Sequence, residues 1–137
     1  MKGEILIDNV SFWVDKKIIY CKVCSDFNES FVESNMEEIF LYAISELSKD
    51  VYMPIIINMK ELSYALKIRL FKILSRNRLI KEKVLSKTFL VDSFLSKLIL
   101  SIHNIANDPV VPNTIFKDKK SAVKHCNKLN MVFNVFI

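Results

Sequence analysis

Apolar patterns typical of helices and of strands alternate along most of the chain, and this alternation constrains the fold more than any other feature. Apolar residues at i, i+3, i+4 and i+7 predict helices with one buried face, whereas short β-branched runs predict buried strands. The helical patterns begin near Ser34, Leu62, Ser93 and Asp118, and the strand patterns cover residues 54–57, 84–91 and 114–116. The sequence therefore predicts an α/β fold, a mixed but mostly parallel sheet of about five strands with about four helices.

Two further strands are predicted near the N-terminus. Residues 5–14 and 18–23 are rich in β-branched and aromatic side chains, and the polar triplet Asp15-Lys16-Lys17 separates them. A short polar break between two such runs favours a β-hairpin. We therefore expect a hairpin ahead of the helix-strand units.

Three of the predicted helices carry a capping residue. Ser34 and Glu37 have the spacing of a capping box, Asp92 or Ser93 precedes the third helix, and Asp118 precedes the last one. Two apolar stripes are expected to face the core, namely Leu95, Leu98, Ile99, Ile102 and Ala106 in the third helix, and Ala122, Val123, Cys126 and Leu129 in the last.

The chain has 137 residues, of which 51% are hydrophobic, and this is sufficient for one domain with its own core. Residues 1–137 are predicted to form a single domain, with 131–137 as an apolar C-terminal extension that adds a strand or contacts a second copy. Glu4 and Asp8 interrupt any secretory signal, and the apolar stretch from Phe94 is too short to cross a bilayer. We expect a cytoplasmic protein without a membrane span.

The sequence does not indicate a nucleotide loop, a metal site or a catalytic centre. Gly3 is the only glycine, whereas phosphate-binding loops need several. Cys21 and Cys24 have the spacing of redox or zinc motifs, but on a strand this spacing points the side chains to opposite faces. His125 and Cys126 are helix neighbours whose side chains point apart. We therefore predict reduced structural cysteines, no cofactor and no enzyme activity.

The order of elements, a hairpin followed by repeated helix-strand units, resembles the STAS domain of bacterial anti-sigma factor antagonists and their SpoIIAA-like relatives. The stretch 54–74 reads PIIINMKELSYALKIRLFKIL and looks like that family's central strand, loop and following helix. The stretch 112–123, PNTIFKDKKSAV, looks like the last strand and helix of small uncharacterised bacterial STAS-like proteins. The resemblance covers about residues 10–130. It implies a non-catalytic regulatory or protein-interaction module.

The phosphorylation motif of the anti-sigma factor antagonists has no match at the corresponding position. Those proteins carry an Asp-Ser-Ser-Gly type motif at a helix N-terminus, where a kinase phosphorylates a serine. The corresponding stretch here is Leu66-Lys67-Ile68-Arg69, with Ser63 nearby. Phosphorylation would add negative charge at such a helix N-terminus. The resemblance therefore predicts a STAS-like module that lacks the phosphorylatable serine.

The two parts of the chain differ in the sign of their charge. Residues 1–50 hold 5 basic and 10 acidic side chains, and residues 51–137 hold 15 basic and 5 acidic ones. Arg69, Lys72 and Arg76 are spaced so that they would form one exposed ridge of the second helix. The predicted interaction surface consists of Lys67, Arg69, Lys72, Arg76 and Arg78.

The charge of this predicted surface leaves several partners open. An acidic protein surface, a phosphorylated ligand and anionic lipid all suit it, and the alternative is a helix face that is only solvated. Nucleic acid is the weakest of these partners, because aromatic residues scarcely interleave with the basic ones and no DNA-binding motif is present.

Two functions remain open at this point. The first is a module that binds another protein through the second helix. The second is a carrier of a small apolar or amphipathic, lipid-like ligand, because the chain has ten Phe residues and a positive mean hydropathy of +0.23. A homodimer through the apolar tail is also open.

Overall fold

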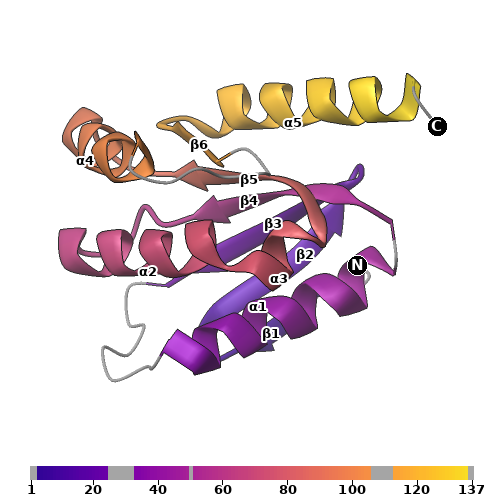
Figure 1. The fold of residues 1–137 in the computed structure, drawn as a ribbon, viewed down its shortest axis with the longest axis horizontal. Coiled ribbons are helices and arrows are strands. Elements are labelled where there is room, and N and C mark those ends of the chain that lie inside the picture. The colour runs from indigo at the N-terminus through magenta and orange to yellow at the C-terminus, as the bar shows by residue number, and fades with distance from the viewer. Residues whose placement is uncertain (1–2, 25–32, 50, 106–112, 136–137) are drawn as a thin grey trace.

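A computed structural model describes residues 3–24, 33–49, 51–105 and 113–135. Within these ranges a six-stranded mixed sheet carries helices on both of its faces (Figure 1). The strands lie side by side in chain order, β1-β2-β3-β4-β5-β6. The predicted α/β class is confirmed, with six strands instead of about five and five helices instead of about four.

The N-terminal part of the sheet is an antiparallel meander. It consists of β1 (Ile5–Ile7), β2 (Val10–Asp15) and β3 (Ile18–Val23). The predicted strand 5–14 is in fact two strands, because Asp8 and Asn9 form a tight turn with φ of 50° and 67°. Lys16 and Lys17 form the second turn, with φ of 50° and 64°. Two-residue hairpin turns of type I′ require positive φ at both positions, so the hairpin expected at this triplet is confirmed.

The rest of the sheet is parallel and is built from helical crossovers. Strands β3, β4 (Met53–Asn58), β5 (Val84–Leu90) and β6 (Asn113–Phe116) run in the same direction. The connecting helices are α1 (Glu33–Ser48), α2 (Tyr64–Arg76) with the short α3 (Arg78–Lys81), and α4 (Phe94–Ile105). These helices form one layer, in which α2 lies between α1 and α4, and α5 (Lys119–Val135) packs on the opposite face of the sheet (Figure 1).

The helices on the two faces of the sheet create two hydrophobic cores. The larger core lies under α1 and α2 and contains Phe12, Phe40, Phe71 and Phe89 among its buried side chains. The smaller core lies under α5 and consists of Ile18, Tyr20, Ile56, Leu90, Ala122 and Cys126. Ile56 faces the smaller core while its neighbours in β4 face the larger one. This double coverage explains why the sequence of β4 is continuously apolar.

Most predicted helix ends agree with the structure. The backbone N–H of Ser96 donates to Ser93 Oγ at 3.1 Å, and that of Ser121 donates to Asp118 Oδ2 at 2.8 Å, so both expected caps are confirmed. The expected cap at Ser34 is wrong, because α1 begins at Glu33 and Ser34 lies within the helix. Ala106 and the two prolines at 109 and 112 lie outside the described residues.

The apolar stripe predicted for α4 faces the wrong way. Leu95, Leu98 and Ile102 were expected in the core but are exposed, and Ile99 is half-buried. The buried side chains of α4 are instead Ser96 and Leu100. The helical period is therefore right, but hydrophobicity did not indicate which face meets the sheet.

Residues 131–135 of the predicted C-terminal extension continue α5 instead of forming an extra strand, and residues 136–137 lie outside the described residues. Met131 and Val132 are exposed in the last turns of α5, and Phe133 packs edge-on against Tyr52 with ring centroids 6.3 Å apart. The predicted stripe of α5 is confirmed at its centre, where Ala122 and Cys126 are fully buried. Across the described ranges, no helix has the length and apolar character needed to cross a bilayer.

Candidate functional site

Helix α2 contains four of the five residues of the predicted interaction surface, namely Lys67, Arg69, Lys72 and Arg76. The helix starts at Tyr64, and Ser63 caps it by accepting a hydrogen bond from the backbone N–H of Leu66 at 3.3 Å. Arg69 and Arg76 are exposed and Lys72 is half-buried, so these three side chains lie on the outer surface of the helical layer. The predicted basic ridge of α2 is therefore accessible to a partner.

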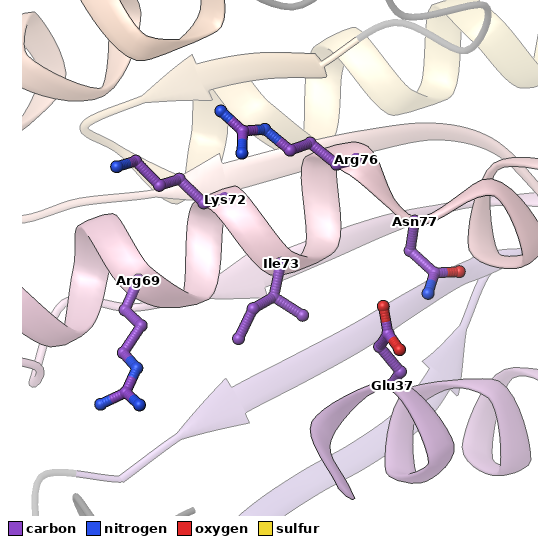
Figure 2. A pocket seen from close by; sticks show the side chains of 6 residues that line it. All are labelled: Glu37, Arg69, Lys72, Ile73, Arg76 and Asn77. Carbon is purple, nitrogen blue, oxygen red and sulfur yellow. The ribbon is translucent and has the colours of Figure 1, made fainter. Parts of the chain in front are cut away.

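A groove runs between this ridge and the start of α1. Its volume is about 310 Å³, and its lining consists of Glu37, Arg69, Lys72, Ile73, Arg76 and Asn77. Figure 2 shows Arg69 and Ile73 on the side of α2 that faces α1, whereas Lys72 and Arg76 extend the other way. The ridge is thus split between two sides of the helix. Three cations against one carboxylate give the groove a positive field.

Asn77 and Arg78 mark the end of the ridge. Asn77 Oδ1 accepts the backbone N–H of Ile80 at 2.8 Å and so caps the short helix α3. Arg78 is the first residue of α3 and is exposed. Because α2 ends at Arg76 and Arg78 belongs to α3, Arg78 does not continue the row of Lys72 and Arg76.

Lys67 does not belong to this surface, contrary to the prediction. Its side chain is only 4% exposed, and its ammonium donates to Asp92 Oδ1 at 2.6 Å and to Ser96 Oγ at 3.3 Å. The hydrogen bond from Lys67 lowers the pKa of the Asp92 carboxyl from its usual value. Lys67 therefore connects α2 to the start of α4.

Lys87 is a second lysine that is buried inside the protein. It is fully buried in β5, and its ammonium donates to the backbone carbonyls of Leu74 and Ser75 at 3.0 and 3.1 Å. These carbonyls stand at the end of α2, where the helix dipole favours a cation. Lys87 therefore satisfies two backbone carbonyls at the C-terminal end of α2 from the sheet beneath the helix.

Ser63 places an exposed hydroxyl at the N-terminus of α2, because the helix begins at Tyr64. The stretch Leu66-Lys67-Ile68-Arg69, which the resemblance sets against the phosphorylation motif, lies within the first two turns of the helix and holds no hydroxyl. A helix N-terminus stabilises negative charge. The absence of a phosphorylatable serine at the position of the motif stays a prediction.

Two of the three cysteines are buried in the cores, and His125 packs against an aromatic ring. Cys21 is buried in the larger core, and burial raises its pKa well above the usual value. Cys126 is buried in the smaller core, and burial raises its pKa to about 11. His125 packs against the ring of Phe116, and burial lowers its pKa. His103 is half-buried in α4. Among the described residues, no group of three metal-binding side chains comes together.

A second hollow lies at the opposite end of α1. Its volume is about 720 Å³, which is within the usual range for small-ligand sites. Its apolar part comes from Trp13, Val14 and Leu47. Charged side chains border it, namely Asp15, Lys16, Glu46 and Lys49. No local sequence pattern indicated this hollow, because its walls come from three separate segments.

The exposed face of α4 is the feature that sequence reasoning missed. Phe94, Leu95, Leu98 and Ile102 are 67%, 51%, 46% and 60% exposed. A row of large apolar side chains on one helix commonly marks an interface. Part of the signal was present in the sequence, because seven of the twelve residues of α4 are apolar and they do not all fit on one buried face.

The chain was compared with protein-family models, with curated proteins and with solved structures, and nothing in any of these sets matches it.

Proposed function

We propose that this protein is a non-catalytic interaction module of STAS type, which binds an acidic region of a partner protein through the outer face of α2. The observation that carries this proposal is the group of Arg69, Lys72 and Arg76, which lie on the outer face of α2, line the groove beside α1 and extend to both sides of the helix. Positive grooves of this kind attract and orient carboxylates. A regulatory role follows if the partner is itself a regulator.

The STAS assignment is supported by the order of the elements. A hairpin precedes β4, and α2 follows β4 directly, as in the resemblance drawn from the sequence. The exposed hydroxyl of Ser63 at the start of α2 adds support, because a helix N-terminus stabilises the negative charge that a phosphate there would carry. The proposed module binds through charge and does not depend on that modification.

Affinity purification with mass spectrometry tests the proposal. The tagged protein is recovered from the organism that encodes it, in parallel with the variant Arg69→Gln/Lys72→Gln/Arg76→Gln. A matched control, Lys120→Gln/Lys124→Gln/Lys128→Gln, removes three exposed charges from α5 on the other face of the sheet. We expect the α2 variant to lose a partner that the wild type and the control retain.

The melting temperature of each variant shows whether the loss reflects binding or unfolding. Recovery of the same proteins by all three forms, with all three folded, would refute the role of α2. An acidic partner should also elute at moderate salt, because contacts between exposed charges are screened within about 8–10 Å at physiological ionic strength.

A second candidate function is binding of a small amphipathic ligand in the hollow beside Trp13. Its mixture of apolar and charged walls, with a volume of about 720 Å³, favours such a ligand. Native mass spectrometry of gently purified protein tests this function. A bound small molecule that is lost in the variant Leu47→Arg would support it, and a bare protein mass would count against it.

A further inference from the structure

The outer face of α4 and the basic face of α2 are neighbours in one helical layer. Tyr64 and Ile68 of α2 line a shallow depression together with Ser96, Ile99 and Leu100 of α4. Lys72 and Arg76 follow Ile68 at four-residue intervals on the same row of α2. This row of α2 thus has an apolar residue, Ile68, beside α4, and two cations, Lys72 and Arg76, after it.

The described cations closest along the chain to the contact of α2 with α4 come from both helices. Lys72 and Arg76 follow Ile68 by one and two helical turns, and Figure 2 shows that they extend away from α1. Lys97 belongs to α4 itself, one helical turn after Phe94. The described carboxylate at the start of α4, Asp92, is already paired with Lys67. The charged border that these residues give the stripe is therefore positive.

This border decides between the candidates that could cover the stripe. Two copies packed through α4 would bring lysines and arginines of one copy to those of the other, and such juxtaposition is unfavourable. A flat anionic membrane that touched α2 and α4 would also approach the carboxylates of α1, including Glu38 and Glu46, which are exposed in the same layer. A single helix is about 10 Å wide and can cover α2 and α4 alone.

We infer that an acidic amphipathic helix of a partner protein docks along α4, with its apolar side chains on Phe94, Leu98 and Ile102 and its carboxylates on Lys72, Arg76 and Lys97. The inference rests on the proposed function and specifies its partner. The ammonium of Lys67 in α2 donates to Asp92, just before α4, and to Ser96 within α4, so these contacts join the two helices that form the docking surface.

Fluorescence anisotropy with synthetic peptides tests the inference. The probe is a labelled helix of about 20 residues made of Leu, Ala and Glu, with Leu at i, i+3, i+4 and i+7 and Glu on both flanks. The matched peptide has Lys in place of every Glu. We expect the Glu peptide to bind and the Lys peptide to bind at least about tenfold more weakly.

Two pairs of exposed apolar residues provide the protein variants. Leu98→Gln/Ile102→Gln changes the stripe, and Met131→Gln/Val132→Gln changes exposed apolar residues on α5. We expect at least about tenfold weaker binding for the first pair and no change for the second. Equal binding by the wild type and the Leu98→Gln/Ile102→Gln variant would overturn the inference.

The same variants separate the failure of this inference from the failure of the proposed function. If Arg69→Gln/Lys72→Gln/Arg76→Gln abolishes binding of the native partner and the α4 variant does not, the inference is wrong and the proposed function stands. If neither variant weakens binding of the native partner or of the Glu peptide, the inference and the proposed function are both wrong. Light scattering that shows a dimer broken by Leu98→Gln/Ile102→Gln would overturn the inference. Binding to phosphatidylglycerol vesicles but not to the Glu peptide would overturn it as well.

Discussion

Replacing Asp92 with Asn should destabilise the protein more than replacing its partner Lys67 with Met. The ammonium of Lys67 is almost wholly buried, whereas the side chain of Asp92 is 49% exposed. In Asp92→Asn the ammonium keeps a neutral acceptor and Ser96 but loses the only charge that compensates its burial in this pair. In Lys67→Met the remaining carboxylate is left at the surface, where water can solvate it.

The burial of each side chain determines how much stability each substitution should cost. Removal of one partner from a fully buried ion pair costs about 3–5 kcal/mol. Because Asp92 is partly exposed, the cost should be smaller than for a fully buried pair. We therefore expect Asp92→Asn to lower the free energy of unfolding by about 1–3 kcal/mol. Met fills much of the space of the lysine stem, so Lys67→Met should cost about 1 kcal/mol or less. The double variant should have about the same free energy of unfolding as Lys67→Met, because neither variant leaves a buried charge.

Urea unfolding of the four proteins at pH 7 measures these differences. The result that would refute the reasoning is a larger loss for Lys67→Met than for Asp92→Asn. The pH dependence gives a second check. Because Lys67 lowers the pKa of Asp92, the contribution of the pair is complete above the unfolded value of about 3.9. It is lost as pH falls through the lower folded value, so wild type and Asp92→Asn should converge only below about pH 4.

Three other predictions concern buried groups and a hairpin turn. Lys87→Met should lower the free energy of unfolding by about 2–4 kcal/mol, because two backbone carbonyls lose their donor, and an unchanged urea midpoint would contradict this. Lys16→Asn/Lys17→Gly should raise the melting temperature, with a gain of about 1 kcal/mol, because both residues have positive φ; a lower temperature would rule out strain at this turn. Cys21 and Cys126 should react with a thiol reagent at pH 8 only after unfolding, because burial raises both pKa values; rapid labelling of either in the native protein would show that it is accessible.

The parts of the fold that depend on local sequence were predicted well. Helix caps at Ser93 and Asp118 need only a side chain and the next turn of backbone, and both are present. The continuous apolar run of β4 likewise indicated its central place. The split between β1 and β2 was missed, although the polar pair Asp8-Asn9 in the middle of the run 5–14 was a readable signal for a turn.

The location of the charges could not be predicted in the same way. The sequence alone does not distinguish Lys67, Arg69 and Lys87, yet Lys67 and Lys87 are buried while Arg69 is exposed. Burial of a lysine depends on acceptors that the fold brings from elsewhere, here the carboxylate of Asp92 and the carbonyls at the end of α2. Such contacts join residues 12 to 25 positions apart, so no local pattern reveals them.

The orientation of α4 follows from the buried ammonium of Lys67. Ser96 must face α2 to accept from Lys67, and residues two apart on a helix point in nearly opposite directions, so Leu98 faces outward. Turning the helix by half a turn would bury Leu98 and Ile102, a gain of about 1.5–3 kcal/mol each. It would also remove Ser96 from an ammonium whose burial costs several kcal/mol without partners. A helix from a partner laid on the stripe satisfies both demands, because the apolar residues become buried while Lys67 keeps its acceptors.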